Sequence, residues 1–80
     1  MTRYFFDMRD GEAFSKDDEG MEFLDIEHAQ MEAVASLADM AKDLSGKVPN
    51  SLGHPFSVEV RDIHGLLFVV GFRFARNWVH

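Results

Sequence analysis

The residue in this 80-residue chain that most resembles a catalytic group is Asp7, which follows two aromatic residues in the stretch "YFFDMRDG". A catalytic carboxylate needs burial or a like-charged neighbour that raises its pKa. Because side chains alternate between two faces along a strand, Asp7 falls on the face opposite to Tyr4, Phe6 and Met8. We therefore expect Asp7 to be a solvated or turn-bracing residue, not a catalytic acid.

Metal binding is the second chemistry to consider. The acidic run "DDEG" over residues 17–20 lacks the alternating oxygen ligands and the closing glutamate of a calcium loop, so we expect a turn before a helix. Apart from the spacing Asp62-x-His64, the histidines do not show the close ligand pairs of a zinc site; they are His28, His54, His64 and His80. The sequence predicts no metal and no cofactor.

Nucleophilic catalysis has equally little support. The chain has no cysteine, its serines lie in no nucleophile elbow, and no glycine-rich phosphate loop is present. A domain of this size, whose apolar face is filled by its own helix, leaves little volume for a substrate pocket. We expect a protein that is not an enzyme.

The net charge of −6 is spread unevenly, with twelve acids and four bases in residues 1–43 and two acids and four bases in residues 44–80. Because nucleic-acid affinity comes from basic charge, the balance argues against nucleic acid as a partner. The candidate contact for a polyanion is the small basic group Arg61, Arg73 and Arg76. It supports one alternative function, a nucleic-acid-linked regulator similar to small antitoxin-like domains.

The location follows from what the sequence lacks. The first residues turn acidic at Asp7, too early for the apolar region of a signal peptide. No apolar run approaches the roughly 20 residues that a membrane span needs. Together with the absence of cysteine, these features predict a soluble, cytoplasmic protein with a single domain over residues 1–80.

Two segments predict β-hairpins. In "FFDMRDGEAF", a three-residue loop over residues 9–11 sets Phe6 opposite Phe14, whereas a two-residue Asp10-Gly11 loop would set Phe14 opposite Asp7 and mix apolar with polar side chains. The three-residue loop is therefore expected, with Gly11 in the left-handed position that such loops use.

The same rule applies to "VEVRDIHGLLF". A loop over residues 63–65, with Gly65 in the left-handed position, keeps apolar side chains opposite one another. It pairs Val60 with Phe68, Val58 with Val70, and Phe56 with Phe72.

Between the hairpins lies a helix. Asp25 is a good N-cap, and Gly46 followed by Pro49 ends the pattern. The apolar positions recur at intervals of three and four and form one stripe; they are Ile26, Ala29, Ala33, Leu37, Met40, Ala41 and Leu44.

The predicted fold is α+β, with the order β-β-α-β-β and one helix packed on one face of a four-stranded antiparallel sheet. Sheet order 2-1-3-4 would be antiparallel throughout, and order 2-1-4-3 stays open. The residues expected to face the helix are Tyr4, Phe6, Met8, Phe14, Val58, Val60, Phe68, Val70, Phe72 and Phe74.

One helix covers only one face of such a sheet, which is roughly 20 Å wide at about 4.8 Å per strand. Phe5, Leu67 and Val69 fall on the other face, with Trp78 as a further candidate, and a clustered apolar patch of this kind often marks an interface. We therefore expect a homodimer or a protein partner. The expected function is a small non-catalytic protein-interaction or homodimerising module.

Several motifs also resemble a known family. The stretches "RYFFDMRDG", "DDEGMEFLD", "AQMEAVASLADMA" and "VRDIHG" are similar to small bacterial proteins, common in rhizobia and their relatives, that make up a domain of unknown function. The matching positions are Tyr4, Phe5, Phe6, Asp7, Asp10, Gly11, Asp17, Glu19, Gly20, Asp25, Ala29, Glu32, Ala33, Val60, Asp62 and Gly65.

This resemblance covers most of residues 3–70 and is weaker from Gly71 onward. It implies a bacterial, cytosolic protein and supports the predicted fold. It carries over no activity and no catalytic residue.

Overall fold

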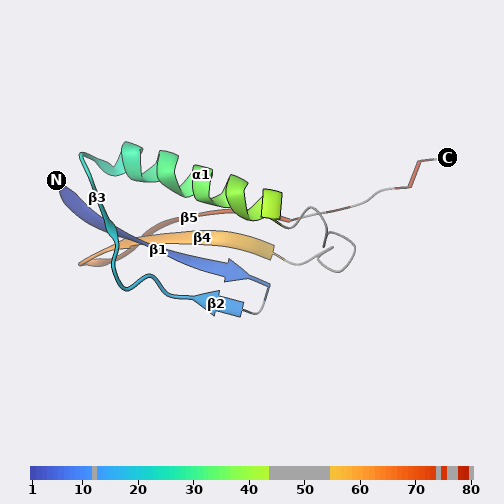
Figure 1. Ribbon diagram of the computed structural model, residues 1–80, viewed down its shortest axis with the longest axis horizontal. Helices are drawn as coiled ribbons and strands as arrows, with labels where there is room; N and C mark the ends of the chain where they lie inside the picture. Colours follow the sequence, from blue (N-terminus) through green and yellow to red (C-terminus); the bar gives the residue numbers. More distant parts are fainter. Residues whose placement is uncertain (12, 44–54, 74, 76–77, 80) are drawn as a thin grey trace.

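The computed structural model describes residues 1–11, 13–43, 55–73, 75 and 78–79. Its elements are β1 (Thr2–Asp10), β2 (Ala13–Ser15), β3 (Met21–Phe23), α1 (Ile26–Asp43), β4 (Pro55–Asp62) and β5 (Gly65–Arg73). The sheet has the order β2-β1-β4-β5, with β3 also paired to β1, and every pairing is antiparallel. Helix α1 runs along the sheet and packs on β4 and β5 (Figure 1). The α+β class and the single helix on an antiparallel sheet are as predicted, and order 2-1-3-4 is the one adopted.

A short strand, β3, adds to the predicted set. Strand β2 pairs with the end of β1, from Met8 to Asp10, and β3 pairs with its beginning, from Thr2 to Tyr4. The chain between them, residues 16–20, passes the middle of β1. The edge of β1 away from β4 is therefore occupied by two three-residue strands and the segment that joins them.

The first hairpin differs from the prediction. Its pairs are Met8 with Ser15, Arg9 with Phe14, and Asp10 with Ala13, so the predicted three-residue loop is wrong. The reason lies on the other side of β1, where the backbone N–H of Gly11 donates to the Pro55 carbonyl at 2.8 Å. Strand β1 thus stays extended through Gly11, and the turn comes later than expected.

This shift moves Phe14 to the opposite face of the sheet. The Phe14 ring is 47 % exposed, and the guanidinium carbon of Arg9 lies 4.6 Å from the ring centroid. The prediction that Phe14 faces the helix is therefore wrong.

The second hairpin has the predicted core pairs, Val60 with Phe68, Val58 with Val70, and Phe56 with Phe72. Its loop is one residue shorter than predicted, because Asp62 pairs directly with Gly65. An irregularity between Val60 and Arg61 shifts the register by one. This bulge accommodates Leu67, the residue of β5 that has no partner in β4.

Helix α1 begins as predicted. The carboxylate Oδ1 of Asp25 accepts the backbone N–H of His28 at 2.9 Å, and the His28 ring Nδ1 lies 2.6 Å from the same oxygen. His28 therefore binds the N-cap at the position where a capping box would carry Glu or Gln.

The core lies between α1 and the sheet. Ala29 and Ala33 are fully buried, and their small side chains let the helix approach the strands closely. The other buried members are Tyr4, Phe6, Val58 and Val60, with Met8, Phe23, Leu37, Phe68 and Val70 packed against them. Leu44 and Phe74, which were expected in this layer, lie outside the described residues.

Candidate functional site

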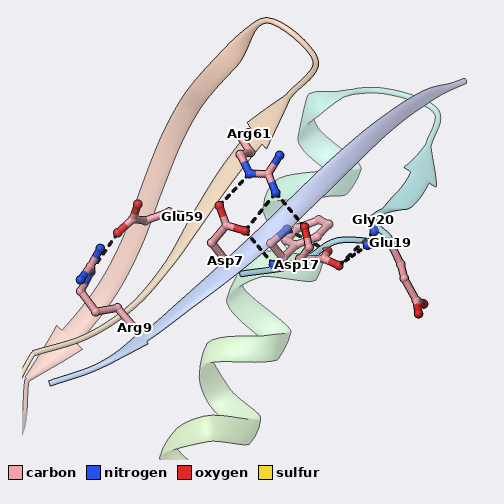
Figure 2. Close-up of polar contacts among 8 residues, drawn as sticks. Asp7, Arg9, Asp17, Glu19, Gly20, Glu59 and Arg61 are labelled. Atoms are coloured by element: carbon pink, nitrogen blue, oxygen red, sulfur yellow. Dashed lines mark hydrogen bonds and ion pairs between the residues drawn. The ribbon is translucent and has the colours of Figure 1, made fainter. Parts of the chain in front are cut away.

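The most developed polar arrangement lies on the face of the sheet away from α1, and we call Asp7, Asp17 and Arg61 the Asp7 cluster (Figure 2). Asp7 is only 5 % exposed, so of its two expected roles, solvated or turn-bracing, the first is wrong and the second is confirmed by the bond from the turn residue Asp17. Arg61 Nε donates to Asp7 Oδ2 at 2.8 Å, and Arg61 Nη2 lies 3.4 Å from Asp7 Oδ1. The backbone N–H of Asp17 donates to Asp7 Oδ1 at 2.9 Å.

Asp17 explains how Asp7 becomes buried. Its Oδ1 accepts the backbone N–H groups of Glu19 and Gly20, both at 3.0 Å, and its Oδ2 accepts the backbone N–H of Phe6 at 3.1 Å. Arg61 Nη2 also donates to the Asp17 carbonyl at 2.7 Å. Residues 16–20 are thereby fixed over the middle of β1. The predicted turn in "DDEG" is present, but β3 follows it before the helix begins.

The electrostatics of the cluster favour ionised carboxylates. Burial raises the pKa of Asp7, but the Arg61 side chain and the Asp17 backbone N–H outweigh it and leave that pKa below its ordinary value of 3.8. Burial also raises the pKa of Asp17, and the N–H groups of Gly20, Phe6 and Glu19 together bring it below 3.8. At neutral pH both groups are carboxylates and proton acceptors only.

These contacts describe what the cluster does within the fold. Every oxygen of the two carboxylates accepts at least one hydrogen bond. Among the described residues, no buried side-chain nitrogen or oxygen lacks a partner. A general acid near neutral pH would need a raised pKa, and the cluster has the opposite shift. Its geometry serves to attach the segment 16–20 to the sheet.

A groove of about 340 Å³ lies beside this segment, between β1 and α1. Phe6, Met8 and Met21 supply its apolar lining, and Ser15, Lys16, Asp17, Glu32 and Ser36 supply its polar lining. In the part of the chain that the structure describes, no group of three or more His, Asp or Glu side chains is placed to hold a metal ion.

Of the predicted basic group, the structure places Arg61 and Arg73 apart. Arg61 belongs to the Asp7 cluster, and its guanidinium carbon lies 4.5 Å from the centroid of the Phe5 ring. Arg73 is exposed at the other end of the hairpin, opposite Pro55, and Arg76 lies outside the described residues. Contact with a polyanion stays a prediction.

The predicted interface residues have different surroundings. Phe5 is half-buried beneath Arg61, so the expectation that it lacks cover within the chain does not hold. Leu67 and Val69 are 39 % and 52 % exposed. Trp78 is exposed beyond the end of β5.

The two edges of the sheet differ sharply. On one side, β2 and β3 are three residues long, and Asp17 binds the backbone N–H of Phe6 between them. On the other side, β5 is a nine-residue edge strand with no charged residue and no proline from Leu66 to Phe72. Proteins usually protect an edge by shortness, charge or proline. The β1 side has such protection, whereas the middle of β5 has none.

One side of helix α1 is turned toward β5. Glu32 and Ser36 line the groove toward β1 and residues 15–17, and each residue turns a helix by about 100°, so Val34 points away from that groove, toward the β5 side. Met31 is opposite the buried Ala29 and Ala33 on the helix and is 70 % exposed, and Val34 is 51 % exposed. They line a shallow hollow of about 600 Å³ on the outer side of the helix with Glu27, Gln30, Ala35 and Ala38. We call the edge of β5 and the Val34 side of the helix the β5 flank.

No helix among the described residues is long and apolar enough to cross a membrane.

Comparisons with known proteins complete the description of the chain. A search of curated proteins and a search of solved structures found no match. The model of one family, described as a domain of unknown function (DUF6894), matches residues 3–73. This range includes the helix, the Asp7 cluster and all residues of the described strands except Thr2. The chain therefore belongs to the DUF6894 family.

Proposed function

We propose that this domain is a non-catalytic protein-interaction module that binds its partner along the β5 flank. The observation that carries the proposal is the contrast between the two sheet edges. An edge strand that is long, uncharged and without proline is a template for pairing with another chain. In β5 the exposed backbone edge lies next to the half-exposed side chains of Leu67 and Val69.

The polar groups of the domain support the non-catalytic part of the proposal. The acids of the Asp7 cluster are ion-paired or bound to backbone N–H groups, and their pKa values lie below the ordinary range. They stabilise the protected edge of the sheet. Among the described residues, no strand pairs with the outer edge of β5, so this edge can accept a partner.

Site-specific photo-crosslinking in the native host tests this function. A photoreactive phenylalanine analogue replaces Val69 in one variant and Phe14 in a matched control. The two positions lie on the same face at opposite edges and are similarly exposed, 52 % and 47 %. The expected result is a protein adduct from position 69 and none from position 14. No adduct from position 69, or the same adducts from both positions, would contradict the proposal.

A further inference from the structure

The middle of α1 and the middle of β5 lie at the same level along the sheet. Helix α1 starts beside the first residues of β1, and Met40 near its other end shares a hollow with Asp10, the last residue of β1. The centre of the helix is therefore level with Asp7. Strand pairing places Val69 of β5 in the same row as Asp7. A two-fold axis beside Val69 would thus pass the middle of both elements.

The distance from helix α1 to the outer edge of β5 suits pairing with a second copy of the chain. Helix α1 packs on β4 and β5 (Figure 1), and neighbouring strands lie about 4.8 Å apart. If two β5 strands pair across the axis, each helix above its β4–β5 pair lies about 5 Å from that axis. The two helix axes are then about 10 Å apart, the distance at which helices pack. Ala38, one turn after Val34 on the same side of the helix, allows this approach.

We propose that the partner of the β5 flank is a second copy of this chain, paired β5 to β5 about a two-fold axis beside Val69 and Val70. This inference rests on the proposed function, because it names the partner of the same surface. The two sheets become one continuous antiparallel sheet, and the two α1 helices lie antiparallel on the same face. The Val34 sides of the two helices pack against each other over the joined strands.

The area is sufficient for a specific dimer. The helix and the strand are both about 27–30 Å long at 1.5 Å and 3.3 Å per residue. A layer of one sheet and one helix is about 20 Å thick. The contact therefore removes about 1,000 Å² from solvent over both copies, the lower limit of specific interfaces. Backbone hydrogen bonds between the two β5 strands add to this area.

The absence of cysteine in the chain permits a direct test on the purified protein. Val34→Cys places a thiol on the β5 side of α1, and Asp39→Cys places one on the opposite side of the same helix as a matched control. Under mild oxidation, Val34→Cys should give a disulfide-linked species of twice the 9.1 kDa chain mass, and Asp39→Cys should stay monomeric. Equal cross-linking of both variants, or none from Val34→Cys, would overturn the inference.

The proposed function and this inference fail in different ways. A monomeric purified chain, together with a foreign protein cross-linked at position 69 in the host, would overturn the self-pairing and retain the interaction module. Absence of any adduct at position 69 would overturn the proposed function itself.

Discussion

The substitution Asp17→Asn probes the Asp7 cluster with almost no change of shape. The Asp17 carboxylate accepts backbone N–H groups on both oxygens, from Phe6 on Oδ2 and from Glu19 and Gly20 on Oδ1. An amide has one oxygen only. Whichever way it turns, its NH₂ group faces a backbone N–H that needs an acceptor.

The expected loss in the free energy of unfolding follows from these hydrogen bonds. A hydrogen bond to a charged group contributes about 1.5–3 kcal/mol, and a donor left unsatisfied adds to the loss. The Phe6 N–H is part-buried at the sheet edge, so we expect Asp17→Asn to lower the free energy of unfolding by about 2–3 kcal/mol. For a domain of this size each kcal/mol lowers Tm by about 4–8 °C.

Urea denaturation followed by far-ultraviolet circular dichroism measures this change, and Asp18→Asn is the matched control. Asp18 is the neighbouring residue, has the same charge and is exposed, so its substitution should change the stability by less than about 0.5 kcal/mol. The two variants alter net charge equally. If Asp17→Asn is no more destabilising than Asp18→Asn, the structural role of the cluster is refuted.

Three further outcomes are expected. Gly11 and Gly65 have φ values of 59° and 129°, so alanine at either position should lower the stability by about 1 kcal/mol, and unchanged denaturation midpoints for both would contradict these turns. The pKa values of Asp7 and Asp17 lie below 3.8 in the folded chain, so the folded state binds fewer protons than the unfolded state near that pH. The urea midpoint of the wild-type chain should therefore stay level down to about pH 5 and fall below about pH 4, with a smaller fall in Asp17→Asn; a midpoint that rises on acidification would contradict the shifts. On heparin at low salt the chain should flow through because of its net charge of −6, whereas retention would favour the nucleic-acid alternative.

The parts of the fold that follow from local patterns could be predicted from the sequence. The apolar stripe and the Asp25 cap indicated the helix and its beginning. Alternation along β4 and β5 indicated their pairing, because one register alone placed Phe56 opposite Phe72. These signals lie within one element or between neighbours in the chain.

The wrong predictions concern residues whose positions depend on contacts with segments far away in the sequence. The loop of the first hairpin depends on the bond from Gly11 to Pro55, which no local pattern shows. The three-residue loop was expected because it places Phe14 in the core, whereas Arg9 covers the Phe14 ring on the other face. Strand β3 is too short for the apolar–polar alternation of a strand to be recognised in the sequence, although Met21 and Phe23 do flank a glutamate.

The burial of Asp7 could not be inferred without the sheet order. Asp7 and Arg61 meet because β1 lies beside β4, where Phe5 pairs with Arg61. With order 2-1-4-3 these side chains would have been separated by a strand. Once β1 is adjacent to β4, an acid and an arginine on the same uncovered face become an expected pair.

Self-pairing through the β5 flank is tested most directly by the mass of the purified chain, measured by light scattering as its concentration is raised through the micromolar range. Pairing of two copies should raise the mass from 9.1 kDa to twice that value. Val69→Lys should abolish the rise, because it places like charges beside the two-fold axis, and Phe14→Lys at the opposite edge should not. A mass that stays at one chain throughout, or a dimer that Val69→Lys leaves unchanged, would contradict the claim that the β5 flank binds a second copy.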